Sequence, residues 1–349
     1  MSLSLRHEVL RLPLRDPFRI ARPEHGSGHF ATTVIVELRD ARHPDLIGYG
    51  EGYPDTFYGE TPATMAAVFP LLLDAVGSPD LESTDGLSAA SERTRRAIRW
   101  NGAAKCALDT ALHDLAGKVM DRPISALLGL AGPIPATDFT LGIDEPAVVA
   151  ERARRAAAFP ALKIKVGGPA DLETLRAVRG VYDKPIRVDA NTAWTPDVAL
   201  GLVHDLDGLG VELIEQPFPD NRLDWLADLQ ARSPLPIVAD ESCVVDEDLD
   251  RLVGVVAGVN VKLAKCGGPG TAAAMLGRAR ELGFRTFLGC MEETSVAIAA
   301  SAAVAPLAEW VDLDGCLLLA EDPFDGLELG PDHRWRRSDA PGLGLRRRG

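Results

Sequence analysis

The feature that most constrains this chain is a regular alternation of short apolar runs and helical stretches beyond about Pro123. Successive runs lie 23 to 26 residues apart, the length of one strand, one helix and two short loops. The runs are centred on Phe139, Ile164, Val188, Leu213, Val238, Val261, Phe287 and Asp312. Strands that alternate with helices pair in parallel through right-handed crossovers. Eight evenly spaced strands predict a closed (β/α) barrel, because the alternative, a doubly wound open sheet, usually has fewer strands and a less even spacing.

The residues before this repeat have a different pattern. Alternating strand-like runs are followed by helical stretches, which predicts a separate α+β unit. The strand-like runs span 3–14, 31–38 and 46–53, and the helical stretches span 61–76 and 101–120. The residues from about Ala320 lack the repeat, so we expect them to return over the first unit. The predicted division is a capping domain (1–122), a barrel (123–319) and a C-terminal segment (320–349).

Composition and charge argue against several classes of partner. The 349 residues include 37 basic and 51 acidic side chains, a net charge of −14, so the field of the molecule repels nucleic acid and anionic lipid. No apolar run reaches about 18 residues, and the first residues do not resemble a signal peptide. We therefore expect a cytoplasmic protein without a membrane or nucleic-acid partner. The five cysteines form no CxxC pair, which indicates reduced thiols.

Charged residues stand near the ends of most of these predicted strands. Barrel strands are buried on both faces, so a charge there is costly unless it is paired, metal-bound or catalytic. Three of these residues are carboxylates on consecutive strands: Asp189, Glu215 and Asp240. Three converging carboxylates repel one another unless a cation lies between them, and an all-oxygen site suits Mg²⁺. The alternative is that each carboxylate caps the following helix or pairs with an arginine such as Arg187.

Lysines form the second group of charged residues. Lys163 and Lys165 are two residues apart on one strand and therefore point to the same face, whereas Lys262 lies four strands further round, across the barrel mouth. A lysine that is partly desolvated beside another cation has a lowered pKa and can act as a general base. Two such lysines can remove a proton from one face of a metal-bound carbon acid and return it to the other. Salt bridges to Asp189 and Glu215 are the alternative, and they are compatible with this role.

These residues stand in motifs that resemble the enolase superfamily, its muconate-lactonizing subgroup and, more narrowly, the dipeptide epimerases. The motifs are LKIKVG at 162–167, DAN at 189–191, EQP at 215–217, ADES at 239–242 and NVKLAKCGG at 260–268. The resemblance covers nearly the whole chain. It implies a modified (β/α)8 TIM barrel, (β/α)7β, with an N-terminal α+β capping domain.

The resemblance also implies roles for individual residues. The three carboxylates would bind Mg²⁺, and Lys163 would help to hold the substrate carboxylate. Lys165 and Lys262 would be the acid/base pair. Lys265 also lies near the sixth strand end and is the rival of Lys262. Because the catalytic lysine of the family matches the first lysine of NVKLAK, we assign the role to Lys262.

The narrower resemblance depends on Asp312 and Asp314 at the eighth strand, which look like the DxD motif that binds the free α-ammonium group of a dipeptide. Two carboxylates suit a cationic amine. The other positions that match the dipeptide site are Thr140, Cys290, Glu292 and Arg22. Arg22 suits an acidic substrate side chain and Glu292 does not, so acidic, cationic and apolar second residues stay open. Two cap loops, 18–29 and 55–60, are expected to close the site.

The reaction implied by this resemblance is a Mg²⁺-dependent 1,1-proton transfer through an enediolate, which epimerises the C-terminal residue of an L,L- or L,D-dipeptide. The alternatives within the superfamily are N-acylamino-acid racemisation, cycloisomerisation and o-succinylbenzoate synthesis, whose substrates lack a free amine for Asp312 and Asp314. A catalytically silent barrel with a binding role is the alternative from another class. Association into a homo-oligomer is expected only by analogy with the family.

Overall fold

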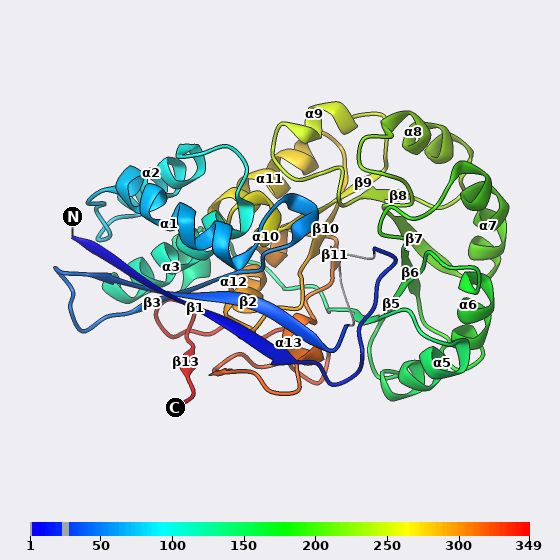
Figure 1. Ribbon diagram of the computed structural model, residues 1–349, viewed down its shortest axis with the longest axis horizontal. Coiled ribbons are helices and arrows are strands. Elements are labelled where there is room, and N and C mark those ends of the chain that lie inside the picture. The colour runs from blue at the N-terminus through cyan, green and yellow to red at the C-terminus, as the bar shows by residue number, and fades with distance from the viewer. Residues whose placement is uncertain (1, 23–27) are drawn as a thin grey trace.

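The computed structural model describes residues 2–22 and 28–349. Its first part is a cap that begins with a three-stranded antiparallel sheet, as the alternating runs predict (Figure 1). The strands are β1 (Leu3–Pro13), β2 (Phe30–Asp40) and β3 (Gly48–Gly52). β1 and β2 pair along their whole length in one continuous antiparallel register.

Helices follow this sheet in the chain, and some of them pack against it. They are η2 (Thr56–Tyr58), α1 (Pro62–Val76), α2 (Thr84–Arg96), α3 (Gly102–Val119) and α4 (Ile124–Leu127). Thr61 begins α1 because its side chain accepts a hydrogen bond from the amide of Thr64, and Pro62 occupies the first helical position. α3 approaches β3 closely: a Cβ atom at Gly50 would lie 1.9 Å from the carbonyl oxygen of Ala107. The glycines at every second position of β3 therefore allow the backbone of α3 to pack directly against the strand. The apolar pattern does not predict α2, which buries few apolar side chains.

The second part is an eight-stranded parallel sheet in the order β4 to β11. Its strands are β4 (Phe139–Leu141), β5 (Leu162–Lys165), β6 (Ile186–Asp189), β7 (Val211–Glu215), β8 (Ile237–Ala239), β9 (Gly258–Lys262), β10 (Arg285–Gly289) and β11 (Trp310–Val311). The amide of Asp138, beside β4, donates to the carbonyl of Val311 in β11 at 3.1 Å and joins the first and last strands. The predicted (β/α)7β barrel is confirmed. Seven of the predicted run centres lie within strands, and the eighth, Asp312, directly follows β11.

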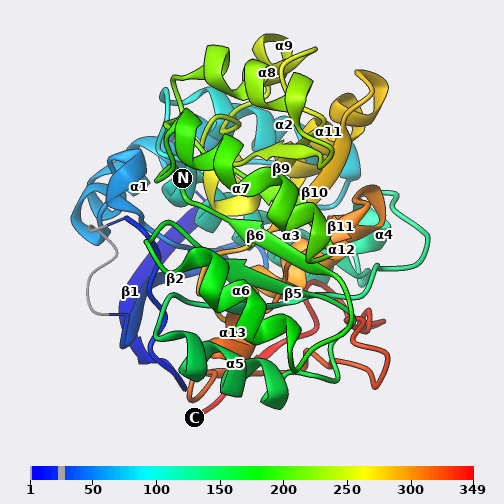
Figure 2. The same cartoon turned by 90° about the vertical axis from the view of Figure 1, so that its right-hand side faces the viewer.

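Helices surround the barrel on the outside, as Figure 2 shows for α5 to α8. They are α5 (Pro146–Arg155), α6 (Asp171–Arg179), α7 (Pro196–Gly208), α8 (Leu223–Arg232), α9 (Asp248–Leu252), α10 (Leu263–Cys266), α11 (Pro269–Glu281), α12 (Ser295–Val304), η3 (Ala305–Leu307) and α13 (Gly315–Leu318). Inside the barrel, Leu213, Val238, Phe287 and Trp310 form a small apolar cluster. Leu213 and Val238 stand two residues before the carboxylates of β7 and β8, and such pairs point to one face. The cluster is therefore a floor beneath the charged side chains.

One buried carboxylate joins the cap to the barrel. Glu51 of β3 accepts hydrogen bonds from the amides of Thr294, at 2.9 and 3.1 Å, and Ala297, at 3.1 Å, at the start of α12. It also accepts from the hydroxyls of Thr33 and Thr294. A buried carboxylate is costly unless it is hydrogen-bonded, so this network fixes the cap sheet against the loop after β10.

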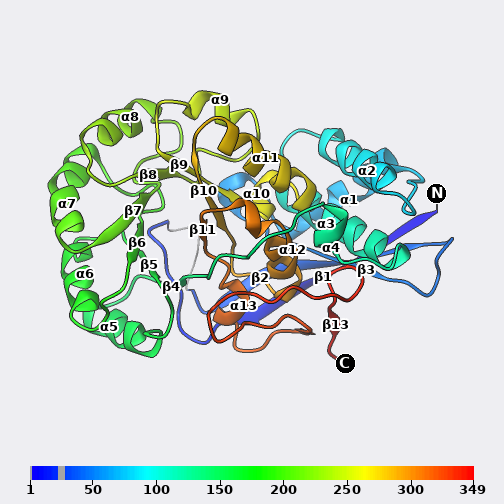
Figure 3. The ribbon, with the colours of Figure 1, turned by 180° about the vertical axis from the view of Figure 1, so that it is seen from behind.

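The C-terminal segment runs beside the cap (Figure 3). The amide of Ala320 donates to the carbonyl of Pro13 at 2.8 Å, and that of Leu343 donates to Asp114 at 2.7 Å. Two short strands, β12 (Phe324–Asp325) and β13 (Arg346–Arg347), pair within it. The division at 1–122, 123–319 and 320–349 stays a prediction. In the parts of the chain that the structure describes, we find no helix whose length and apolarity would let it cross a membrane.

Candidate active site

The charged side chains predicted at the strand ends come together at one end of the barrel. The parallel register places Lys165 opposite Asp189, and Asp189 opposite Glu215. Asp240 directly follows β8, and Lys262 is the last residue of β9. The carboxyl ends of parallel strands meet at one edge, and barrels of this kind carry their sites there.

The three carboxylates predicted to bind metal form a tight group. Asp189, Glu215 and Asp240 each offer one oxygen, and these oxygens lie within 4.8 Å of one another. All three side chains are buried. Burial, reinforced by the charge of Asp189, raises the pKa of Glu215 to about 7. Glu215 Oε2 accepts no hydrogen bond of regular geometry, although Lys163 Nζ lies 2.8 Å away. A buried all-oxygen donor set with such an oxygen fits a hard divalent cation such as Mg²⁺.

The lysines of β5 are paired with these carboxylates. Lys163 Nζ lies 2.8 Å from Glu215, 2.9 Å from Asp312 and 3.2 Å from Asp189. Lys165 Nζ lies 2.7 Å from Asp189. The salt bridges that the sequence leaves open as an alternative are therefore present, and they hold both ammonium groups at the carboxylates predicted to bind metal.

For Lys163 and Lys262 the structure indicates raised pKa values, whereas the sequence predicts lowered ones. Burial disfavours the ammonium form of Lys262, but the negative charge of Asp240, with that of Glu215, outweighs burial and raises its pKa. Burial acts in the same sense on Lys163, whose pKa is nevertheless raised well above its ordinary value by the charges of Asp312 and Glu215. The carboxylates lie about 3 Å from these ammonium groups, and their charge outweighs that of the neighbouring cations.

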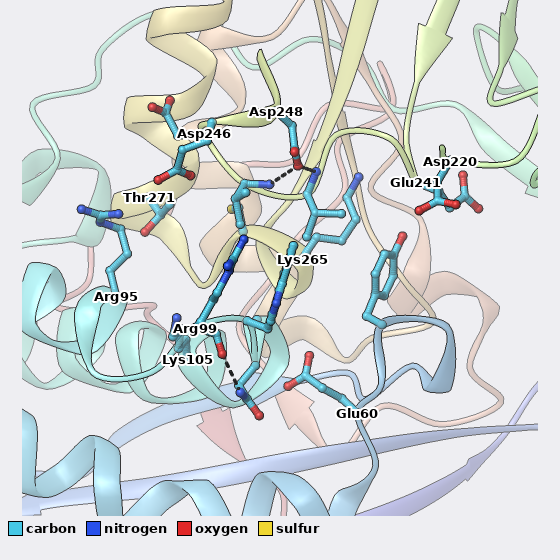
Figure 4. Close-up of a pocket in the computed structure, with 18 of the residues that line it drawn as sticks. Glu60, Arg95, Arg99, Lys105, Asp220, Glu241, Asp246, Asp248, Lys265 and Thr271 are labelled. Carbon is cyan, nitrogen blue, oxygen red and sulfur yellow. Dashed lines mark hydrogen bonds between the residues drawn. The ribbon is translucent and has the colours of Figure 1, made fainter. Parts of the chain in front are cut away.

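Lys262 and its rival Lys265 line different cavities. Lys262 lines a pocket of about 40 Å³ together with Lys163 and Lys165. Lys265 lines a cavity of about 930 Å³ between the cap and the barrel, shown in Figure 4. The larger cavity is not the better candidate, because neither lysine of β5 is among its described lining residues. The smaller pocket has room for only a few waters, so its walls must move apart to admit an organic substrate.

Lys265 is held in a different way from the other lysines. Its ammonium group donates to a carboxylate oxygen of Asp240, and also to the carbonyl oxygens of Asp240 at 2.6 Å, Cys243 at 2.9 Å and Asn260 at 2.9 Å. Every proton of the ammonium group therefore has a fixed acceptor. This arrangement suits a residue that positions Asp240, and it favours Lys262 for the proton transfer.

Replacing Lys265 with methionine is expected to lower the free energy of unfolding by about 3–5 kcal/mol, because one partner of a buried ion pair is removed. Denaturant unfolding followed by circular dichroism measures this loss. Lys184→Met is the matched control, since Lys184 donates to the carbonyls of Ala157, Ala158 and Phe159 from a partly exposed position. Equal losses in the two variants would contradict the positioning role.

The two aspartates predicted to bind an amine follow β11, the last strand of the barrel, and lie beside Thr140 of β4, the first strand. The Thr140 hydroxyl donates to Asp312 at 2.9 Å and its amide donates to Asp314 at 2.6 Å. Burial and the charge of Asp312 raise the pKa of Asp314 well above its ordinary value. Burial would also raise the pKa of Asp312, but Lys163 more than offsets this and lowers it. An ammonium group beside this pair would favour the ionised form of Asp314, which suits the predicted amine site.

Arg22 and Glu292, predicted to contact substrate, both line the smaller pocket. Arg22 donates to Asp55 at 3.0 Å, and its other terminal nitrogen lies 3.8 Å from Glu241. The guanidinium carbon stands 4.4 Å from the centre of the Phe57 ring. The charge of Arg22 is therefore compensated within the protein before any substrate binds.

The remaining predicted residue, Cys290, also lines the pocket. Burial, with the charges of Asp312 and Asp314, raises the pKa of its thiol well above the ordinary value, so it is a neutral part of the wall. The predicted cap loop 18–29 enters the pocket through Phe18, Ile20 and Arg22, while positions 23–27 lie outside the described residues.

Two asparagines in this region were not predicted as functional. The Asn191 amide donates to Asp189 at 3.0 Å, and the Asn260 side chain donates to Glu215 at 2.7 Å. Each therefore orients one of the carboxylates predicted to bind metal. A signal exists for Asn260, which stands two residues before Lys262 on one strand and so shares its face. Asn191 lies in the DAN motif, but its positive φ of 41° is visible only in the structure.

Comparison with known families relates this arrangement to described proteins. Residues 6–129 match the N-terminal domain of mandelate racemase and muconate lactonizing enzyme, and residues 147–348 match the enolase C-terminal domain-like family. The chain belongs to the enolase superfamily. Within it, this enolase-superfamily protein falls in the muconate-lactonizing subgroup, as its motifs predict.

Several relatives of this enolase-superfamily protein are dipeptide epimerases. The L-Ala-D/L-Glu epimerase of Bacteroides thetaiotaomicron is 37% identical over 338 residues, which cover 96% of this chain and 85% of that protein. The L-Lys-D/L-Arg epimerase of Methylococcus capsulatus is 35% identical, with 95% of both chains covered. A crystal structure of the Enterococcus faecalis dipeptide epimerase with Mg and L-Leu-L-Tyr has a TM-score of 0.88 at 33% identity, covering 99% of both chains. The dipeptides named for these relatives differ in side-chain chemistry, so similarity to them is compatible with more than one class of dipeptide.

Proposed function

We propose that this protein is a dipeptide epimerase, an isomerase that inverts the α-carbon of the C-terminal residue of an L,L- or L,D-dipeptide. The observation that carries the proposal is the position of Lys165 and Lys262. They lie on β5 and β9, four strands apart in an eight-stranded barrel, and line one pocket. Inversion by 1,1-proton transfer needs one group that removes a proton and another that supplies one on the opposite face.

The other residues of the pocket are assigned by their charge. Lys163, held between Glu215 and Asp312, binds the substrate carboxylate. Asp312 and Asp314 receive the α-ammonium group, and Thr140 orients both of them. This amine site favours a dipeptide over the amine-free and N-blocked acids used by other members of the superfamily.

Mg²⁺ is the proposed cofactor, with Asp189, Glu215 and Asp240 as its ligands. When bound, the ion supplies positive charge that stabilises the negative charge developing beside the substrate carboxylate during proton removal. Lys265, Asn191 and Asn260 orient the three ligands. The Enterococcus faecalis relative was crystallised with Mg and a dipeptide, which supports this assignment.

A dipeptide library incubated with the protein and Mg²⁺ in D₂O tests the proposal, because epimerisation must exchange the α-proton with solvent. Mass spectrometry detects one incorporated deuterium, and chromatography on a chiral phase detects the second diastereomer. The double variant Lys165→Ala, Lys262→Ala measures the background. We expect exchange with inversion in one class of dipeptide. Failure of every dipeptide to exchange, with Mg²⁺ binding demonstrated by calorimetry, would refute the function.

Two coarser expectations accompany this function. We propose that the protein works in the cytoplasm, which agrees with its charge and composition. We also propose, by analogy with related barrels, that it forms a homo-oligomer. Sedimentation velocity distinguishes a monomer from an assembly.

A further inference from the structure

The cavity of about 930 Å³ between the cap and the barrel has no part in the proposed reaction. Its volume lies in the range of about 300–1,000 Å³ that is usual for small-molecule sites. The end of α2, the start of α3 and the loop between them form its cap wall, and the loops after β7 and β8 form much of its barrel wall (Figure 4). The charges on these two walls decide which class of molecule the cavity suits.

The cap wall is basic. It includes Arg95 of α2, Arg99 of the following loop and Lys105 of α3. Arg95 pairs with Glu92 at 2.7 Å. The guanidinium carbon of Arg99 lies 5.1 Å from the centre of the Trp100 ring. One short stretch of the chain therefore gives this wall three positive charges.

Lys105 is the most informative residue of this wall, because it is only 7% exposed. Its ammonium group donates to the carbonyl oxygen of Ile98 and forms no ion pair with a carboxylate in the described part of the chain. Glu60 also lines the cavity, but its carboxylate accepts from two backbone amides at the start of α3. Burial lowers the pKa of Lys105, and the charge of Arg95 lowers it further. Because a buried ammonium group without a counter-ion is costly, an anion in the cavity would stabilise it.

The loop between α2 and α3 has an unusual backbone. Trp100 and Asn101 both have a φ of 59°, a left-handed conformation that is rare for a residue as bulky as tryptophan. The Trp100 side chain is 53% exposed at the cavity. Backbone strain of this kind is concentrated at binding and catalytic sites. The loop therefore supports a binding role for the cap wall.

The barrel wall supplies the opposite charge. Asp220 and Glu241 follow β7 and β8, and the Ser242 hydroxyl donates to the carbonyl oxygen of Asp220 at 2.9 Å, which holds the two loops together. Glu241 Oε2 is buried and has no hydrogen-bond partner among the described residues. Figure 4 places both carboxylates on the opposite side of the cavity from Arg95 and Lys105. The cavity thus has a basic end and an acidic end.

Three further carboxylates line the cavity and are less suited to bind a cation. Asp246 pairs with Arg278, and Asp248 pairs with Arg251. Glu247 is exposed, so the solvent screens its charge. The acidic end of the cavity is therefore the pair of carboxylates that follows β7 and β8.

We propose that this cavity is a second binding site and that it takes a short peptide in its zwitterionic form. The peptide carboxylate binds at Arg95, Arg99 and Lys105, and the ammonium group binds at Asp220 and Glu241. One zwitterion neutralises both ends, whereas a simple anion or cation neutralises only one. The site goes beyond the proposed epimerase reaction, because the lysines of the proton transfer are not among its described lining residues and binding there needs no Mg²⁺.

Dialanine and its two blocked forms test the class of ligand. N-acetyl-dialanine retains the carboxylate, and dialanine amide retains the ammonium group. Isothermal titration calorimetry in EDTA measures binding without the metal of the smaller pocket. We expect dialanine to bind about 10- to 100-fold more tightly than either blocked form, the range of one hydrogen bond to a charged group. Free alanine that binds as tightly as dialanine would overturn the assignment to a peptide.

Lys105→Met tests the basic end, because methionine keeps an unbranched chain and lacks the charge. We expect it to weaken dialanine binding about 10- to 100-fold and to change the binding of dialanine amide, which has no carboxylate, by less than about threefold. Lys118→Met is the matched control: Lys118 lies on the same helix, pairs with Asp114 at 2.6 Å and is not among the described lining residues of the cavity.

Asp220→Asn tests the acidic end, and the exposed position of Asp220 makes a folding defect easy to separate by circular dichroism. We expect this variant to weaken dialanine binding about 10-fold and to leave the binding of N-acetyl-dialanine, which has no ammonium group, unchanged. The two variants thus discriminate between opposite blocked forms, which a merely structural role of either residue would not produce.

The outcomes separate this inference from the proposed function. Absence of dialanine binding in EDTA, or equal binding of all three probes, would overturn the second site. Binding that survives in both Lys105→Met and Asp220→Asn but is lost in Asp312→Asn would place the peptide in the smaller pocket and would also overturn it. Exchange of the α-proton in D₂O is measured independently, so the second site and the epimerase function can fail separately.

Discussion

Replacing Lys165 or Lys262 with alanine is expected to reduce epimerisation by about 10²- to 10⁴-fold, the usual contribution of a general acid or base. Each lysine faces one side of the α-carbon in the proposed arrangement, so inversion needs both. The single variants should differ in a second property. Each retains α-proton exchange with the diastereomer whose proton faces the remaining lysine, without inversion. Deuterium incorporation and chiral chromatography measure the two properties separately.

The controls for this prediction are specific. Lys184→Ala removes a lysine that contacts backbone carbonyls away from the pocket, and it should leave turnover unchanged. Both single variants should still bind Mg²⁺, because the carboxylates remain. If Lys262→Ala turns over at the wild-type rate and Lys265→Ala does not, the assignment of the second base is wrong.

Removal of divalent metal with a chelator is expected to abolish turnover, and added Mg²⁺ should restore it. Binding to the folded state alone also stabilises it, by about 2.7 kcal/mol when the ion concentration is 100 times its Kd. Glu215→Gln should lose most of this Mg²⁺-dependent stabilisation, because it removes a charged ligand from the group of three. Thermal unfolding with and without Mg²⁺ measures the difference within each variant, so any effect of the substitution itself cancels.

Glu212→Gln is the matched control for that experiment. Glu212 lies on the same strand as Glu215, but it pairs with Arg187 and accepts from the Trp310 indole at the floor of the barrel. It should retain the full Mg²⁺-dependent stabilisation. Equal losses in Glu212→Gln and Glu215→Gln would mean that Mg²⁺ does not bind at the proposed ligands.

Much of the architecture could be predicted because it depends on local pattern. A strand that is buried on both faces appears in the sequence as a short apolar run. The helix between two such strands sets the spacing of their runs. The carboxylates predicted to bind metal were identified for the same reason, since a charged residue at the end of an apolar run is unusual. Helix α2 was missed because it buries little apolar surface, which leaves a weak periodic signal.

The electrostatic balance of the site could not be predicted in this way. The pKa values of Lys163 and Lys262 are raised, whereas the sequence favoured lowered ones, because the result depends on carboxylates that lie about 3 Å away on other strands. The choice between Lys262 and Lys265 as the second acid/base residue also depends on contacts that are seen only in the structure. Both lie at the end of one strand, and only the structure shows that Lys265 is held by Asp240 and backbone carbonyls.

The sequence by itself determined the barrel, the three carboxylates and the lysines at its mouth, because periodicity and charge are properties of successive residues. Tertiary structure alone decided which charged and polar side chains contact one another. Arg22 meets Asp55, and Tyr53 meets Glu292 across 239 positions of the chain. Such contacts join segments that are far apart in the sequence, and their energy falls steeply with distance.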